Sequence, residues 1–503
     1  MQNVSQAWKN AQAEMIVPEQ FIEIEYSITD PDVQGDGAAS SNGEMRFAST
    51  ESILDKNLYP ALYATLEHNI WSLDGSMDLL DEGSETGYAS NVLSNEEGVF
   101  ESVPVVTISF SKVHIPLVPG VTIIWSNQYD EYATSYRISV WNQGTKVSEH
   151  LYENNKDVRI FADADMQGYD EITVEILKWS KPYRRARLEY FAVGSVNLYS
   201  KNDLMSYSHT QSVDLLSGSL PKTSITFSLN NADGKWNPDN VEGIERYLLE
   251  RQKLTVRYGM KINDGIEWIK AGTFYMSEWS TPMNGLEATF TARDAVEFMN
   301  QEYAGPRSGT LYAIANEALR QAKVDSYEID LSLMDITTDF TEDDDAYIIS
   351  EILQMVANAA CCVMYQDREG VLHIQPVDET LTDYVISKDV SFTHPEYDIS
   401  KELRAVSVNK GLGYAENSLV GEVQTIDNPL ISDATVAQNV ADWSKDVLSR
   451  RRKVSGEFRA DVRMDALDKV TVNSKYADKE VQITEVTYIF NGGFRGNYVG
   501  RVV

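Results

Sequence analysis

The sequence predicts a mainly β, multidomain protein in which one β-sandwich is inserted into a second, different β pattern. Between residues 100 and 194, short segments alternate apolar and polar side chains, and turn residues such as Pro119-Gly120 separate them. Alternation lets one face of each strand be buried while the other face meets water. The segments that show this pattern are residues 100–110, 120–125, 135–141, 158–161, 171–179 and 186–194.

The second observation is a strictly alternating strand at residues 21–28, which has no partner of its own before the sandwich begins. Longer strands with polar turns follow residue 194 and predict a sheet or barrel of antiparallel strands. We infer that the first strand belongs with these later ones. The sandwich is then an insertion, tolerated because its two ends lie close together.

Length and local pattern divide the chain further. A chain of 503 residues exceeds what one hydrophobic core usually supports. Ser308-Gly309-Thr310 precedes apolar residues at helical spacing, as expected of a capped helix, and a hairpin follows Cys361-Cys362. We expect an N-terminal helix and the first part of the barrel at 1–70, the inserted sandwich at 71–194, the rest of the barrel at 195–305, a small α/β domain at 306–395 and a strand-rich C-terminal domain at 396–503.

Composition limits the possible partners. The chain has 77 acidic and 43 basic residues, a net charge of −34, which repels phosphate backbones and argues against specific nucleic-acid binding. The first residues lack a signal-peptide pattern, and no apolar run approaches the ~20 residues of a membrane span. With only two cysteines and no disulfide framework, we expect synthesis in a reducing cytoplasm.

No catalytic, cofactor or metal site is predicted, and we expect that the chain is not an enzyme. The six histidines show no zinc spacing, and no nucleophile elbow, phosphate loop or dinucleotide turn occurs. Asp30, Asp32 and Asp36 in a Gly-containing loop are an alternative calcium site, but their spacing is not that of an EF-hand, so a solvated loop is favoured.

Three tryptophans of the sandwich are candidates for contact with a glycan. The aromatic faces of Trp125, Trp141 and Trp179 could stack on sugar rings. Burial in the sandwich core is equally natural for Trp125 and Trp141, given their strand positions.

Several segments resemble the tail-hub, or baseplate-hub, proteins of phages and prophages of Gram-positive bacteria. The segments are residues 23–30 (EIEYSITD), 64–75 (ATLEHNIWSLDG), 222–231 (KTSITFSLNN), 269–276 (IKAGTFYM), 289–294 (TFTARD) and 481–496 (VQITEVTYIFNGGFRG). The resemblance implies tail-hub β-barrels and a homotrimer at the tail tip, which caps the tube and encloses a channel for the tape measure protein and DNA. It also implies the distal tail or tube protein and baseplate or fibre proteins as partners.

The inserted segment resembles the jelly-roll, carbohydrate-binding-module-like domains of such tail proteins. Matching segments are residues 88–90, 105–110, 169–172 and 178–187, and no sugar-binding residue is carried over from the resemblance. The sequence therefore favours a structural virion protein of the tail tip, with a module that braces neighbours or contacts a host cell-surface glycan. A receptor-binding adhesin and a cell-wall carbohydrate-active enzyme remain as alternatives.

Overall fold

The computed structural model consists of two compact units, each described here by itself. We call Met1–Glu25, Leu198–Asn240 and Lys253–Val503 the scaffold, and Tyr26–Asn197 with Val241–Gln252 the sandwich unit. The residues described are 1–33, 35–46, 48–54, 67, 87–237, 239–240, 244–263, 265–281, 286–324, 326–341 and 345–503. Of the predicted features, most of the 64–75 segment and of the acidic run at 342–345 lies outside these residues.

The fold is mainly β and multidomain, as the sequence predicts. In the described part of the chain, four α-helices accompany the strands, and none is long and apolar enough to cross a membrane. The helices are α1 (Gln6–Ala13), α2 (Leu311–Gln321), α3 (Ile349–Ala359) and α4 (Ala434–Ser449), with short 3-10 turns η1 (Pro31–Val33), η2 (Thr50–Ile53), η3 (Ile244–Tyr247), η4 (Ala295–Phe298), η5 (Leu331–Asp335) and η6 (Asn409–Gly411).

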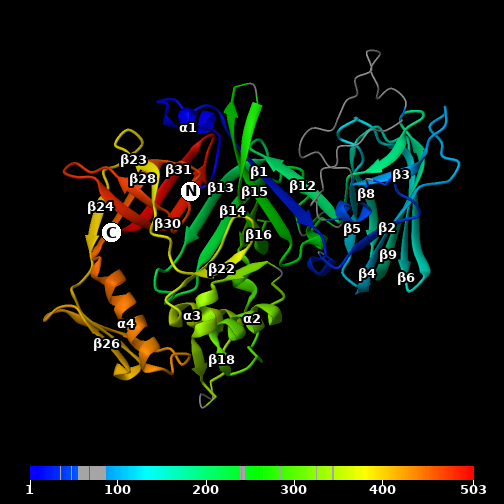
Figure 1. Cartoon of the computed structure of the whole chain (residues 1–503). Helices are drawn as coiled ribbons and strands as arrows, with labels where there is room; N and C mark the ends of the chain where they lie inside the picture. Colours follow the sequence, from blue (N-terminus) through cyan, green and yellow to red (C-terminus); the bar gives the residue numbers. More distant parts are fainter. Residues whose placement is uncertain are drawn as a thin grey trace. The chain divides into compact units, whose positions relative to one another are not determined.

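The sandwich unit contains three sheets (Figure 1). A five-stranded sheet has the order β2-β4-β9-β6-β7, a three-stranded sheet the order β11-β5-β8, and β10 pairs with β3. The strands are β2 (Ala38–Ser41), β3 (Tyr88–Leu93), β4 (Val105–His114), β5 (Val118–Ile124), β6 (Ala133–Asn142), β7 (Thr145–Glu153), β8 (Arg159–Met166), β9 (Tyr169–Trp179), β10 (Arg185–Leu188) and β11 (Tyr190–Val193).

The core of this unit follows the alternation that predicts its strands. Ile138 and Val140 on β6 and Ile172 on β9 face the same apolar cluster as Val121 and Ile123 on β5. The predicted strands are all present, whereas β7 and β2 were not expected. Because β2 pairs with β4, the sandwich begins before the predicted boundary at residue 71.

The scaffold is organised around one sheet of 13 strands. Its main path is β12-β1-β15-β16-β17-β14-β13-β30-β31-β28-β24; off this path, β29 pairs with β30, and β23 pairs with β29. The strands are β1 (Gln20–Ile28), β12 (Ser195–Ser200), β13 (Leu204–Ser212), β14 (Lys222–Asn230), β15 (Lys253–Ile262), β16 (Gly265–Ser280), β17 (Glu287–Arg293), β23 (Leu381–Ile386), β24 (Glu396–Ile399), β28 (Arg452–Arg459), β29 (Lys469–Val472), β30 (Lys479–Phe490) and β31 (Phe494–Val502).

The pairing of β1 confirms that the N-terminal strand belongs with strands beyond residue 195. β1 lies between β12 and β15, so the chain leaves the sheet after β1 and returns to it on the neighbouring strand. A second pairing was not expected. β13 pairs with β30, with His209 opposite Tyr488, so the segments predicted as separate domains at 195–305 and 396–503 share one sheet.

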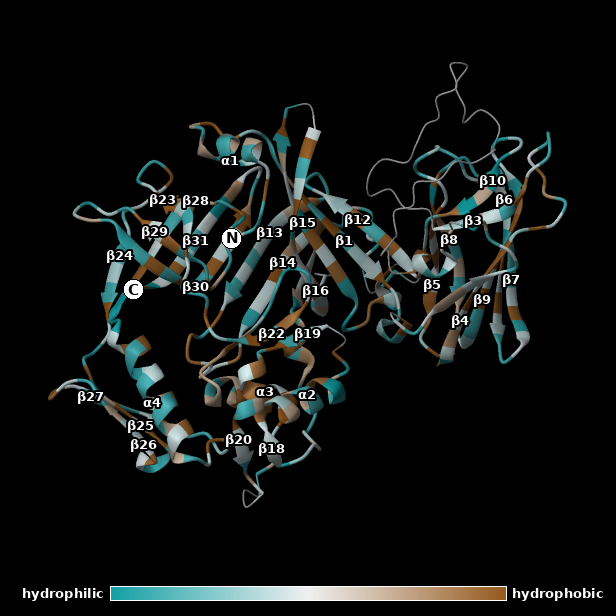
Figure 2. Cartoon of the chain, in the orientation of Figure 1, coloured by the Kyte–Doolittle hydropathy of each residue, from teal (hydrophilic) through white to brown (hydrophobic). Residues whose placement is uncertain are grey.

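The α/β part of the scaffold is larger than the predicted 306–395 domain. One apolar cluster contains Leu319 of α2 and Ile352 of α3, and also Val406 of β25 and Val440 of α4. Figure 2 shows hydrophobic positions on helices α2 and α3. The hydroxyl of Thr310 accepts a hydrogen bond from the N–H of Ala313, which confirms the predicted cap of α2. Its strands are β18 (Ser308–Thr310), β19 (Tyr327–Ile329), β20 (Thr337–Asp339), β21 (Val363–Gln366), β22 (Leu372–Gln375), β25 (Leu403–Val408), β26 (Gly413–Glu416) and β27 (Glu422–Ile426).

Candidate functional site

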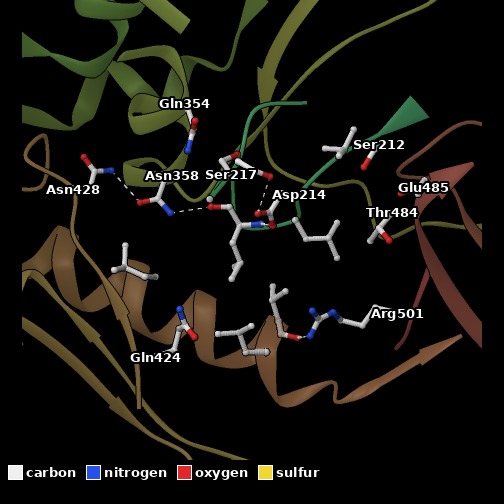
Figure 3. A pocket seen from close by; sticks show the side chains of 18 of the residues that line it. Ser212, Asp214, Ser217, Gln354, Asn358, Gln424, Asn428, Thr484, Glu485 and Arg501 are labelled. Carbon is white, nitrogen blue, oxygen red and sulfur yellow. Dashed lines mark hydrogen bonds between the residues drawn. The ribbon is translucent and has the colours of Figure 1, made fainter. Parts of the chain in front are cut away.

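The scaffold contains a cavity of about 690 Å³, which we call the scaffold cavity (Figure 3). This volume falls in the range of ligand-binding clefts. Four parts of the scaffold form its walls: the loop after β13, helix α3, strand β27 with the turn that follows it, and the C-terminal strands with the end of α4. In residues, these walls are 212–219, Gln354, Met355, Asn358, 424–428, Val447, Leu448, Lys453, Thr484, Glu485 and 499–501.

The loop wall of the scaffold cavity is held by its own hydrogen bonds. The carboxylate of Asp214 accepts from the N–H of Leu216 at 3.0 Å, and the hydroxyl of Ser217 donates to the carbonyl of Cys362 at 2.9 Å. The amide of Asn358 donates to the carbonyl of Leu216 at 2.8 Å and accepts from Asn428 at 3.0 Å. These contacts fix the loop against α3 and satisfy its buried polar groups.

Arg501 on β31 is a cation at the edge of the same cavity. Its Nη1 donates to the carbonyls of Val447 and Arg450 at 3.2 and 3.3 Å. Within the described ranges, no Asp or Glu oxygen lies within ion-pair distance of it. Burial lowers the pKa of Arg501, and the Asp214 carboxylate opposes that shift.

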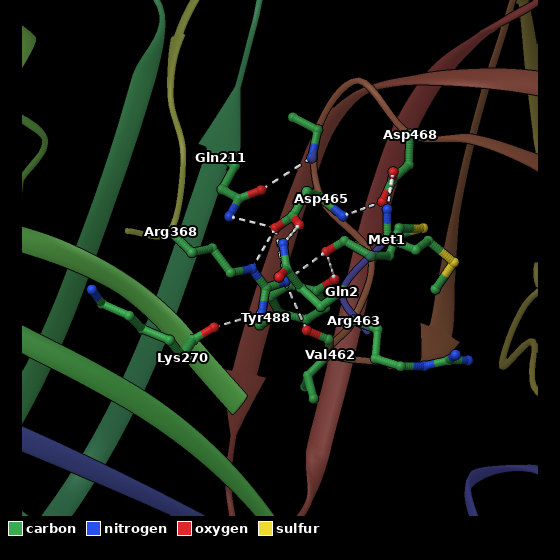
Figure 4. A network of polar contacts seen from close by, with 12 residues as sticks. Met1, Gln2, Gln211, Lys270, Arg368, Val462, Arg463, Asp465, Asp468 and Tyr488 are labelled. Atoms are coloured by element: carbon green, nitrogen blue, oxygen red, sulfur yellow. Dashed lines mark hydrogen bonds and ion pairs between the residues drawn. The ribbon is translucent and has the colours of Figure 1, made fainter. Parts of the chain in front are cut away.

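A second polar cluster fastens the hairpin between β21 and β22 to the scaffold sheet (Figure 4). Arg368 is 5% exposed; its Nε donates to Asp465 at 2.8 Å, and its other nitrogens donate to the carbonyls of Lys270 and Val462 at 3.0 and 2.8 Å. Burial alone would raise the pKa of Asp465, but the guanidinium and the amides of Gln2 and Gln211 hold it below its ordinary value. The pair is fully satisfied, which is the arrangement expected of a structural contact.

Next to this pair lies a buried histidine. Nδ1 of His209 is 2.7 Å from the hydroxyl oxygen of Tyr258, which is 2.8 Å from that of Tyr207. Burial, with a smaller contribution from the positive charge of Arg368, lowers the pKa of His209 to about 3. His209 is therefore neutral at physiological pH.

The three candidate tryptophans lie in different surroundings. Trp125 and Trp179 are 0% and 1% exposed and contact each other edge to face, so the sandwich core uses their rings. Trp141 is half-buried; its indole N–H donates to the hydroxyl of Thr173 at 3.2 Å, and the Lys146 ammonium lies 5.1 Å from its ring centre. Of the three, Trp141 alone is partly exposed.

In the candidate calcium loop, the three aspartates contact side chains of β4. Nδ1 and Nε2 of His114 lie 3.2 and 2.9 Å from oxygens of Asp30 and Asp36, and Lys112 pairs with Asp32 at 2.5 Å. His114 is only 1% exposed, and the sequence did not indicate its partners because they lie about 80 positions away. The three aspartates therefore anchor their loop to β4.

Other titratable groups show no catalytic arrangement in the part of the chain that the structure describes. No group of three or more His, Cys, Asp or Glu residues there could hold a metal ion. Cys361 and Cys362 are free thiols, and burial raises their pKa values to about 11 and about 12. A thiol with a raised pKa is a poor nucleophile at neutral pH.

Comparison with known proteins gives likenesses in structure only. No family model matches the chain, and no curated protein does. Solved structures that resemble it include the 43 kDa tail protein of prophage MuSo2 from Shewanella oneidensis (TM-score 0.44, 13% identity, 61% of this chain and 95% of that one) and the tail protein from Neisseria meningitidis MC58 (TM-score 0.44, 11% identity, 61% and 94%). Prophage tail protein gp18 from Listeria monocytogenes EGD-e is similar over 60% of this chain and 91% of that one (TM-score 0.35, 14% identity). With TM-scores below 0.5, these likenesses do not by themselves establish a shared fold.

Proposed function

We propose that this chain is a structural protein of a phage tail tip, a hub protein that forms a ring, caps the tail tube and links it to baseplate or tail-tip proteins. The observation that supports this most is the pairing of β1 with β12 and β15, across the inserted sandwich. Residues 23–30, 222–231 and 481–496, which lie on both sides of the insertion, resemble tail-hub proteins, and this resemblance also supports the proposal. No catalytic role is part of this proposal.

The topology explains how such a protein can carry an extra module. The chain leaves the scaffold sheet on β1 and returns on β12, which is its hydrogen-bonded neighbour, so the insertion does not interrupt the sheet. Insertions whose ends are adjacent are the ones that folds tolerate. The inserted sandwich, a carbohydrate-binding-module-like jelly roll on the sequence resemblance, can therefore vary while the scaffold keeps its assembly role.

As a hub, the protein would be a homotrimer in the virion, made in the cytoplasm of the host bacterium. Its partners would be the distal tail or tube protein, the tape measure protein and baseplate or fibre proteins. The net charge of −34 suits a wall that encloses DNA, because like charge prevents DNA from adhering.

Mass photometry of the purified chain, alone and with the tail proteins of its own phage, tests this proposal. We expect a species of three times the chain mass, at least when partners are added, and density for the chain at the tail tip in electron cryomicroscopy of the particle. Monomers only, together with a particle that lacks the chain, would refute the hub assignment.

Contact with a host glycan is a second candidate function, favoured by the half-exposed ring of Trp141 on the outer face of β6. Binding of the full chain to host cell-wall polysaccharide should weaken in Trp141→Ala and be unchanged in Tyr476→Ala, an exposed aromatic residue of the scaffold. Equal binding by both variants would exclude Trp141 as a contact. Strong binding to cells by the isolated protein would instead favour a receptor-binding adhesin, and hydrolysis of the polysaccharide would favour a carbohydrate-active enzyme.

A further inference from the structure

The scaffold cavity borders an open edge of a sheet. In the three-stranded sheet β26-β25-β27, β27 pairs in parallel with β25, and no other strand of the described residues pairs with it. Five consecutive positions of the chain, 424–428, line the cavity, and the first three of them belong to β27. Because successive side chains of a strand point to opposite faces, a run of consecutive lining residues means that the edge of the strand faces the cavity.

The edge of β27 that faces the cavity is its unpaired edge, since β25 pairs with the opposite edge. Residues 421–425 are all exposed, and no strand of the described residues pairs with β27 on this side. An unpaired strand edge is a ready template for an added strand. The shape of the site therefore suits an extended polypeptide better than a compact small molecule.

The other walls of the scaffold cavity supply what the side chains of such a segment would contact. Leu216, Val447 and Leu448 line the same cavity as Arg501 and offer apolar surface. Alternate residues of an added strand would face this surface.

Charge decides the chemistry of the segment. Arg501 donates to two carbonyls but has no carboxylate partner among the described residues, although guanidinium groups bind carboxylates best. Three acidic residues also line the cavity: Asp214, whose carboxylate is held in its own turn, Glu485 and Asp427. Lys453 of β28 lies opposite Arg501 on the neighbouring strand and also lines the cavity, so the two cations stand side by side. The acidic residues would disfavour an anion placed away from these cations, so a single acidic side chain at one position fits better than a polyanion.

We propose that the scaffold cavity is a docking site for an extended segment of a partner protein, which adds as a strand to the free edge of β27 and places one Asp or Glu side chain on Arg501. This goes beyond the hub assignment, because the site would bind such a segment whatever the assembly is. It also does not depend on the sandwich unit.

Fluorescence anisotropy of the full chain with synthetic peptides tests the proposal. The probe is a labelled peptide of about eight residues, alternating Thr and Val, with one central Glu; the matched probes carry Gln or Lys there, or N-methylated backbone amides. We expect the Glu peptide to bind roughly tenfold more tightly than the Gln peptide, since a hydrogen-bonded charge is lost. The N-methylated peptide should not bind, because it cannot donate to the strand edge.

Arg501→Gln should remove the preference for Glu over Gln while the chain stays folded. Arg495→Gln is the matched control, because Arg495 lies on the same strand, over the ring of Phe392 and outside the cavity. Hydrogen exchange should also slow at β27 when the Glu peptide is bound. The proposal is overturned by any of three results: no peptide binds, the Lys peptide binds best, or Arg501→Gln keeps the preference for Glu.

Discussion

In the sandwich unit the core is made by strands whose alternation is visible in the sequence, whereas in the scaffold a buried contact is made by the turn of a hairpin. Ile138 and Ile172 occupy inward positions of alternating segments and are fully buried. Arg368 lies in the turn Asp367-Arg368-Glu369-Gly370 between two hairpin strands, yet it is 5% exposed and bonded to Asp465, 97 positions away. Local patterns reveal the first kind of core, and only the folded chain reveals the second.

Of the substitutions considered, Arg368→Met is expected to lower the unfolding free energy most. It tests whether the buried Arg368–Asp465 contact stabilises the scaffold. The substitution keeps much of the side-chain volume but leaves the buried Asp465 without its cation. Breaking a buried pair on one side costs about 3–5 kcal/mol of unfolding free energy. Urea unfolding followed by tryptophan fluorescence measures the loss.

Two further variants control this experiment. Arg368→Met combined with Asp465→Asn should recover part of the loss, because no unpaired charge is then left in the interior. Arg320→Met, which removes an exposed arginine of α2, should leave the urea midpoint nearly unchanged. If Arg368→Met changed the urea midpoint as little as Arg320→Met does, the contact of Arg368 with Asp465 would not stabilise the β21–β22 hairpin against the sheet.

The same contrast explains how far the sequence predicts the molecule. The mainly β fold, the sandwich strands, the cap of α2 at Thr310 and the pairing of β1 beyond residue 195 follow from alternation, capping and the lack of a local partner. The pairing of β13 with β30 does not follow from the sequence, because either strand could equally pair with a strand of its own segment. The scaffold cavity and the contacts of His114 could not be predicted either, because their residues come from segments far apart in the chain. Trp141 differs from Trp125 in exposure although both lie in or beside alternating strands, so the pattern could not tell a core ring from an accessible one.

A second prediction concerns pH, because His209 is buried in the scaffold against tyrosine hydroxyls, whereas the buried His114 of the sandwich unit lies against two carboxylates. The pKa of His209 is about 3 in the folded chain and near its ordinary 6.5 when unfolded. Below pH 6.5 the unfolded chain therefore binds a proton that the folded chain does not, and stability falls as the pH falls toward 3. Between pH 6.5 and 4.5 the unfolding free energy therefore falls by about 2–3 kcal/mol.

His209→Asn removes this proton-binding difference and keeps an acceptor near the Tyr258 hydroxyl. Urea unfolding at several pH values should show a shallower acid loss in this variant than in the native chain. His150→Asn, on the exposed strand β7, should leave the native pH dependence in place. Parallel pH profiles for the native chain and His209→Asn would mean that His209 is protonated in the folded state.

The smallest effect is expected in the sandwich core, where Ile138→Val removes one buried methyl group from β6. Loss of a methyl group from a packed apolar core costs about 0.5–1.5 kcal/mol, and nothing charged is left unpaired. Hydrogen exchange should show faster opening of β6 and β9 while the scaffold strands keep their protection, because the apolar cluster of Ile138 contains only residues of the sandwich unit. Val147→Ala, on the exposed strand β7, should change little. If Ile138→Val lowered the unfolding free energy as much as Arg368→Met, the distinction between the two interiors would be contradicted. A core that loses one methyl group can relax around the space, whereas a buried carboxylate that has lost its cation stays unpaired.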